Sequence, residues 1–297
     1  MANAKISVHF DGPIADNHAV QLRVFSKTLI NIQTAIERAY LDTKYGEIWK
    51  NARLRDEDYG PTEFLMNQTR EGGFIADLIG SQKNDSENIV KRINDAVLPA
   101  YEKSKNYVAE DHEKLIDIAE IRRKNYNAGA QIPTSYEDFL EHPDAKQTRA
   151  YGDRSIAKEF DQIASTIRAR EGDGSSVEIV LYAGKTLSTL MFDDQVSSVF
   201  HNVVATRTLG DPVEIPVTLR ALDSGKGGIS KAKAMNLVSQ KEFNLHIHTI
   251  RGFSGLKKFL RKRNPPPFRI VACPVLEYGA FDPQAGDMYF MSIIDEQ

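Results

Sequence analysis

A run of basic residues in the last third of the chain is the strongest chemical signal in the sequence. Between Arg220 and Arg269 there are 12 Lys and Arg residues but only 2 Asp and Glu residues. Because Lys and Arg side chains neutralise phosphates, such a block in an otherwise acidic chain is a candidate contact for a polyanion. The candidate nucleic-acid contacts within the block are Lys226, Lys231, Lys233, Lys257, Lys258, Arg261, Lys262 and Arg263.

Aromatic residues are interleaved with these cations. Phe243, Phe253, Phe259 and Phe268 all fall within the basic block. Basic side chains mixed with rings suit single-stranded nucleic acid, because the cations meet phosphates and the rings stack on bases. The spacing of Phe253 and Phe259 also fits the buried face of a helix, so we expect these two rings in the core.

The basic block has a second interpretation. Residues 270–297 contain 5 acidic and no basic residues, and residues 1–219 contain 26 basic and 34 acidic residues. The basic block could therefore be a solvated face, or pair with the acidic segment of its own chain or of a neighbouring subunit. In that case the protein is a structural or interaction subunit of a homo-oligomer or complex, without nucleic-acid contact.

Two histidines could in principle bind a metal. His246 and His248 alternate on a predicted strand and so face the same side. Zinc needs a third or fourth ligand, for which Cys273 and the carboxylates of residues 277–287 are the candidates. Those carboxylates could hold Mg²⁺, but Gly and Pro residues between them are more typical of a structured turn. A metal-dependent hydrolase is thus the least favoured hypothesis, and we predict no metal or cofactor.

Two short motifs resemble catalytic loops without matching them. Residues 184–186, Gly-Lys-Thr, lack the earlier glycine of a phosphate-binding loop and are typical of a turn at the end of a strand. Residues 252–255, Gly-Phe-Ser-Gly, lack one residue of a nucleophile elbow, and Ser254 is expected to cap a helix instead. These mismatches favour a non-enzymatic binding protein.

The first 205 residues mix strand-like and helical patterns. Residues 5–10 alternate apolar and polar side chains, which predicts a half-buried strand. An apolar stripe from Phe25 to Tyr40 predicts an amphipathic helix that ends near Gly46. Further patterns predict a hairpin of residues 64–70 and 74–79, helices over 85–105, 110–126, 135–140, 155–170 and 193–203, and strands over 177–182 and 186–192.

The C-terminal part has the pattern of a small barrel. Strands are predicted over residues 213–222, 231–238, 242–249, 268–273 and 288–294, with a helix over 253–263 between the third and fourth. A five-stranded OB-type barrel has this order, although an SH3-like barrel or a β-sandwich with a helix also fits. The predicted fold class is α+β. Residues 1–205 form a small sheet with a helical insertion at about 81–172, and residues 213–297 form an OB-like barrel.

The opening of the chain carries a resemblance. Residues 10–13, Phe-Asp-Gly-Pro, then His18 and the helix through Leu29 resemble the start of a family of uncharacterised bacterial and prophage-borne proteins. The Arg-Glu-Gly-Gly-Phe hairpin at residues 70–74 is similar to one in the same family. The resemblance covers about the first 80 residues. It implies a bacterial or phage origin, with mobile-element or antiphage biology, and brings no established activity.

Composition bounds the compartment. A single Cys cannot form an internal disulfide, no apolar run is long enough for a membrane helix, and the first ten residues lack a signal-peptide pattern. We therefore predict a cytoplasmic protein that does not bind membranes. The leading hypothesis is a nucleic-acid-binding protein without catalytic activity.

Overall fold

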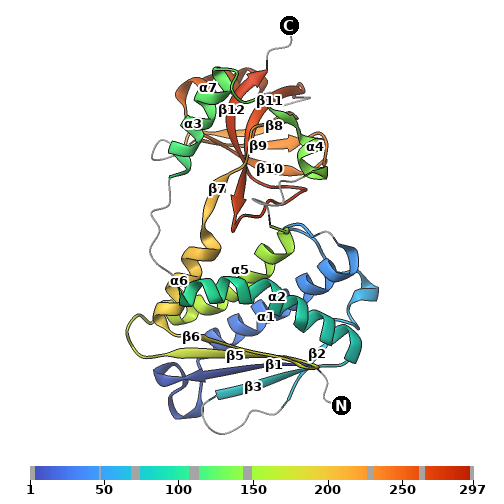
Figure 1. Cartoon of the computed structure of the whole chain (residues 1–297), viewed down its shortest axis with the longest axis vertical. Coiled ribbons are helices and arrows are strands. Elements are labelled where there is room, and N and C mark those ends of the chain that lie inside the picture. Colours follow the sequence, from blue (N-terminus) through green and yellow to red (C-terminus); the bar gives the residue numbers. More distant parts are fainter. Residues whose placement is uncertain are drawn as a thin grey trace. The chain divides into compact units, whose positions relative to one another are not determined.

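The computed structural model is a mixed α+β structure, as predicted, with two separate sheets (Figure 1). It describes residues 4–46, 48–67, 74–106, 114–142, 149–225, 230–260 and 265–294. The chain divides into two compact units, each made of two stretches of sequence. Unit 1 comprises residues 1–109 and 151–205, and unit 2 comprises residues 110–150 and 206–297.

Unit 1 is built on an antiparallel sheet of order β2-β3-β1-β5-β6. Its strands are β1 (Lys5–Asp11), β2 (Phe64–Met66), β3 (Phe74–Gly80), β5 (Ser176–Ala183) and β6 (Thr186–Phe192). Ile6, Val8 and Phe10 of β1 are fully buried, as the alternation predicts. Strands from both ends of the unit pair directly, because β1 lies between β3 and β5.

The described helices of unit 1 cover one face of this sheet (Figure 1). They are α1 (Leu22–Tyr45), α2 (Lys83–Lys105), α5 (Tyr151–Arg168) and α6 (Asp194–Ala205). The predicted end of α1 is confirmed: Gly46 adopts a left-handed φ of 70° and its N–H donates to Asp42. The predicted start of α6 is also confirmed, since Asp193 accepts a hydrogen bond from the N–H of Val196 at 2.7 Å.

Charged side chains tie the helices of unit 1 together. The guanidinium of Arg92 on α2 contacts Asp42 on α1 and Asp153 on α5, each at 2.6 Å. Gly152 leaves room for this group, because a Cβ there would lie 2.4 Å from an Asp42 oxygen and would displace the carboxylate. Nearby, Lys44 contacts the fully buried Asp58 at 2.5 Å. Amphipathic periodicity does not predict such pairs.

Two loops of unit 1 bear on the predicted motifs. Gly184 and Lys185 form the turn between β5 and β6, with Gly184 at a φ of 61°, so this motif is the predicted turn. The predicted hairpin has the paired strands β2 and β3. Its Glu-Gly-Gly turn at residues 71–73 lies outside the described residues.

The described part of unit 2 contains a second sheet and three α-helices. The strands are β4 (Thr134–Ser135), β7 (Arg207–Leu209), β8 (Val213–Asp223), β9 (Ser230–Asn236), β10 (Glu242–Ile247), β11 (Phe268–Glu277) and β12 (Met288–Ile294). The helices are α3 (Leu115–Asn127), α4 (Tyr136–Glu141) and α7 (Ile250–Leu256). Five of these strands match the predicted series, and the Ser135 side chain caps α4 by accepting from the N–H of Asp138.

The five long strands of unit 2 pair in a cycle. β8 pairs with β9, β9 with β10, β10 with β12, β12 with β11, and β11 again with β8. The β10–β12 pair is parallel and the other four are antiparallel. β4 and β7 add to this set by pairing with β8 and β11.

The strands of unit 2 bury two apolar sides. One side gathers alternate residues of β8–β12, including Ile215, Leu245 and Phe290, and also the ring of Tyr136 from α4. The opposite side of β11 and β12 presents Cys273 and Tyr289, which pack against Ala119 of α3. The alternation of the strands therefore serves two cores, one of them completed by a helix distant in sequence.

The domain boundary differs from the prediction in one respect. The sequence analysis assigns the helical stretch between the strands wholly to the first domain, but residues 110–150 belong to unit 2. The physical reason is that α3 buries Ala119 against β11 and β12, Tyr136 enters the unit 2 core, and β4 pairs with β8. No described helix of either unit is long and apolar enough to cross a membrane.

Candidate nucleic-acid interface

The helix that carries the candidate cations begins earlier than predicted. Thr249, not Ser254, caps it, because the Thr249 hydroxyl accepts a hydrogen bond from the N–H of Gly252 at 3.1 Å. α7 ends at Leu256, which is fully buried, and a 3-10 turn follows over Lys257–Phe259. The predicted helix over 253–263 is thus wrong at its start. Lys257 and Lys258 lie in the turn rather than in the α-helix.

Lys257 and Lys258 are exposed, and aromatic rings support both side chains. The ammonium of Lys257 lies 5.2 Å from the centroid of Phe253, and that of Lys258 lies 5.0 Å from the centroid of Phe259. A cation over a ring is attracted by the ring quadrupole. These contacts hold the charged ends at the surface of the turn, where a phosphate can reach them.

Lys231 and Lys233 lie on β9 and point outward. They are exposed and alternate with the buried Ala232 and Ala234. Lys231 lies opposite His246, near the end of β10, and α7 begins shortly after that end. The register therefore places Lys231 at the end of the strand pair from which α7 starts. Lys233 is partly neutralised, since its ammonium is 3.3 Å from a carboxylate oxygen of Glu242.

Four candidate contacts cannot be placed. Lys226, in the β8–β9 connection, and Arg261, Lys262 and Arg263, after the 3-10 turn, lie outside the described residues.

The three described acidic residues of the C-terminal segment, Glu277, Asp282 and Asp287, have partners of their own. Glu277 pairs with Arg207 at 2.5 Å, and Asp282 accepts hydrogen bonds from the N–H groups of the turn that follows it. Asp287 accepts from the amide of Asn244 at 3.1 Å and lies 3.3 Å from the imidazole of His246. Lys231 and Lys257, by contrast, have no ion-pair partner within the part of the chain that the structure describes.

His246 pairs with a carboxylate, and the two histidines do not belong to a metal cluster among the described residues. Within the described ranges, no group of three or more His, Cys, Asp or Glu side chains is arranged to hold a metal ion. His246 contacts Asp287, and Nδ1 of His248 is buried without a hydrogen-bond partner. Cys273 lies beneath α3, where burial raises the pKa of its thiol to about 12. A thiol with that pKa is a poor metal ligand and nucleophile near neutral pH.

The interleaved rings belong to the interior. Phe243 and Phe268 are buried, so the prediction that they stack on bases is wrong. Phe253 and Phe259 are half-buried and pack against the unit 2 core, as expected for the buried face of a helix. The sequence alternates cations with rings because exposed and buried positions alternate.

Sequence reasoning missed the surroundings of His246. Asn244 and His246 share the outer side of β10 with Lys231 and Lys233 of the neighbouring strand, and Asp287 joins them from the start of β12. The alternation of Asn244 and His246 is the signal for their shared face. The approach of Asp287 depends on the parallel β10–β12 pair, which the sequence does not reveal.

No known protein family, curated protein or solved structure matches this chain.

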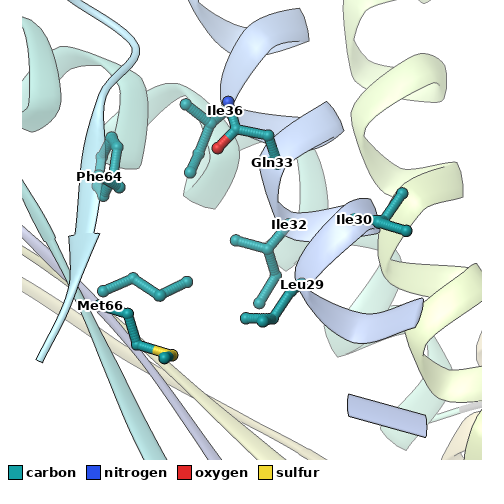
Figure 2. A pocket seen from close by; sticks show the side chains of 8 residues that line it. Leu29, Ile30, Ile32, Gln33, Ile36, Phe64 and Met66 are labelled. Atoms are coloured by element: carbon teal, nitrogen blue, oxygen red, sulfur yellow. The ribbon is translucent and has the colours of Figure 1, made fainter. Parts of the chain in front are cut away.

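Unit 1 offers an apolar groove of about 370 Å³ between α1 and the β2–β3 edge (Figure 2). Its lining side chains are Leu29, Ile30, Ile32, Gln33, Ile36, Phe64, Met66 and Leu78. Ile30 and Met66 are more than half exposed. Because none of these side chains can be charged, the groove does not suit a phosphate.

Proposed function

We propose that unit 2 is an OB-like barrel that binds nucleic acid through its phosphates. The cycle of five strand pairs supports this, as do the parallel pairing of the third and fifth strands and the position of α7 between the third and fourth. OB folds bind oligonucleotides and oligosaccharides on the face of the second and third strands, here β9 and β10.

The charge of this region selects nucleic acid over sugar. The observation that carries the proposal is the placement of the exposed Lys231 and Lys257, which have no ion-pair partner among the described residues. Lys231 lies opposite the end of β10, and Lys257 follows the helix that starts there. Lys231 also lies opposite Asp223 of β8, but no ion pair joins the two side chains. An ammonium without an ion pair gains most from a phosphate, because binding releases the counterions of the nucleic acid.

The proposal needs no bond-making chemistry, so we propose a binding protein rather than an enzyme. The resemblance of the first 80 residues supports a bacterial or phage origin. We propose that the protein acts in the cytoplasm, in mobile-element or antiphage biology.

The test is a gel-shift titration at low salt with labelled DNA and RNA of mixed sequence. The chain with Lys231→Gln, Lys257→Gln and Lys258→Gln should lose at least about tenfold in affinity, since each lost phosphate contact weakens binding at low salt. The matched control is Lys185→Gln in the exposed β5–β6 turn of unit 1, which should bind like the wild type.

Two results would oppose the proposal. Absence of a shift with either nucleic acid would reject it, and so would a triple variant that binds as tightly as the wild type. Light scattering at two salt concentrations should accompany the titration. Self-association that loosens with salt, without nucleic-acid binding, would instead favour the interaction-subunit hypothesis, in which the basic and acidic segments meet across chains.

A further inference from the structure

The aromatic rings of unit 2 pack in or against its apolar cores. The only Trp of the chain is Trp49, in unit 1, and every Phe and Tyr of unit 2 lies within the described residues. Each of these rings is buried or half-buried. Unit 2 therefore carries no fully exposed ring; its partly exposed rings are Tyr126, Phe139, Phe253 and Phe259, which all pack against one of its cores.

The two rings beside the candidate cations are already covered. Phe259 stacks on Phe268 with a centroid separation of 3.8 Å and an interplanar angle of 10°, and the ammonium of Lys258 also lies over it. Phe253 packs against the core and has the ammonium of Lys257 over its ring. Neither ring has the open face that stacking on a base requires.

Proteins that bind single strands without sequence preference combine a basic groove with stacking platforms. Where stacking is missing, the charge of the phosphates is the remaining attraction. A double helix presents one charge per about 1.7 Å of its axis, whereas one of its strands presents one per about 3.4 Å. A surface that uses cations alone therefore meets a higher charge density on a duplex.

We infer that the ligand of unit 2 is a double-helical nucleic acid, contacted on its phosphate backbone and without regard to base sequence. This inference rests on the proposed function and names the substrate class of the same site. The ammonium groups of Lys231, Lys257 and Lys258 supply the described contacts. Bases remain stacked in the ligand, because unit 2 offers no open ring to replace their neighbours.

The experiment compares, for the full chain, a fluorescent duplex of mixed sequence with each of its strands alone at one salt concentration. Fluorescence anisotropy should show tighter binding of the duplex by about threefold or more, with a steeper loss of affinity as salt rises. DNA and RNA duplexes are both used, and the tighter of the two identifies the form of helix that is bound.

A pair of variants tests the role of the rings. Phe253→Leu and Phe259→Leu remove the aromatic faces but keep apolar bulk, so binding should stay within about twofold of the wild type wherever circular dichroism shows a folded chain. Equal or tighter binding of either strand would overturn the inference while leaving the proposed function intact. A folded variant that loses binding would do the same. Failure of every nucleic acid to bind would reject the proposed function itself.

Discussion

At the scale of single residues, the aromatic and basic side chains near α7 have different positions: the rings pack inward and the ammonium groups lie at the surface. Phe253 and Phe259 pack inward, and the ammonium groups of Lys257 and Lys258 rest over their rings. The sequence reveals that both kinds of residue are present. It does not reveal that the rings pack in the interior, because a buried ring on a helix and a ring that stacks on a base can occur at the same spacing in the sequence.

The buried charges of unit 1 make a residue-scale prediction. Arg92→Met leaves Asp42 and Asp153 without their shared guanidinium, and both carboxylates are mostly buried. Breaking such a group should lower the free energy of unfolding by about 3 kcal/mol, as measured by urea unfolding. The control is Lys105→Met, because the ion pair of Lys105 with Glu102 is half-exposed. This variant should lower the free energy of unfolding by less than about 0.5 kcal/mol. Equal effects of the two variants would contradict this account.

Asp58 makes a prediction about pH. Burial acts to raise the pKa of its carboxyl, but hydrogen bonds from the Lys44 ammonium and the Arg55 N–H outweigh burial and hold the pKa below the ordinary 3.8. Because the pKa of Asp58 is lower in the folded than in the unfolded chain, its carboxylate stabilises the fold fully at pH values above 3.8. This stabilisation is lost as the pH falls through the pKa of the folded state. The wild type should therefore exceed Asp58→Asn in unfolding free energy at neutral pH.

The advantage of Asp58 should shrink below pH 3.8. Urea titrations of the wild type and Asp58→Asn across this range provide the check. A difference that stays constant or grows as the solution is acidified would be inconsistent with an ionised, paired Asp58.

At the scale of elements, the long strands and helices were predictable and their ends less so. Alternation predicts β8 to β12 because each strand buries every second side chain. The start of α7 was missed because Thr249 and Ser254 are both good caps, and only the fold shows which hydroxyl meets a free N–H. The two-residue strand β4 is too short for any periodic pattern.

The docking of α3 supplies an element-scale prediction. Ala119 is buried in the same apolar cluster as Cys273, the only thiol of the chain. Burial raises the pKa of that thiol to about 12, so the native protein should react with iodoacetamide far more slowly than the urea-unfolded chain near neutral pH. Ala119→Glu forces a charge into this interface and should speed the labelling of Cys273 by releasing α3.

The control for α3 is Ile121→Glu, which places the same charge on an exposed position of the same helix. It should leave labelling slow. Fast labelling of the native wild type, or equal labelling of the two Glu variants, would show that α3 does not cover the thiol.

At the scale of the whole molecule, the charge that matters is local. Unit 2 contains 19 basic and 18 acidic residues, and unit 1 contains 19 and 23, so neither is strongly basic as a unit. A polyanion would be attracted by the cluster of cations near α7 rather than by net charge, and only at short range in physiological salt. The division of each unit into two stretches of sequence was not predictable. Residues 110–150 have ordinary helical spacing, and that spacing does not indicate which of the two sheets a helix packs on.

The dependence of nucleic-acid affinity on salt tests the central claim most directly. Fluorescence anisotropy with a DNA duplex should give a straight line of log affinity against log salt concentration, with a slope of about −0.9 for each phosphate contact. Neutralising Lys231, Lys257 and Lys258 together should make that slope shallower by about 2 to 3, whereas Lys185→Gln should not change it. An unchanged slope in the triple variant, or no binding at the lowest salt, would contradict the account.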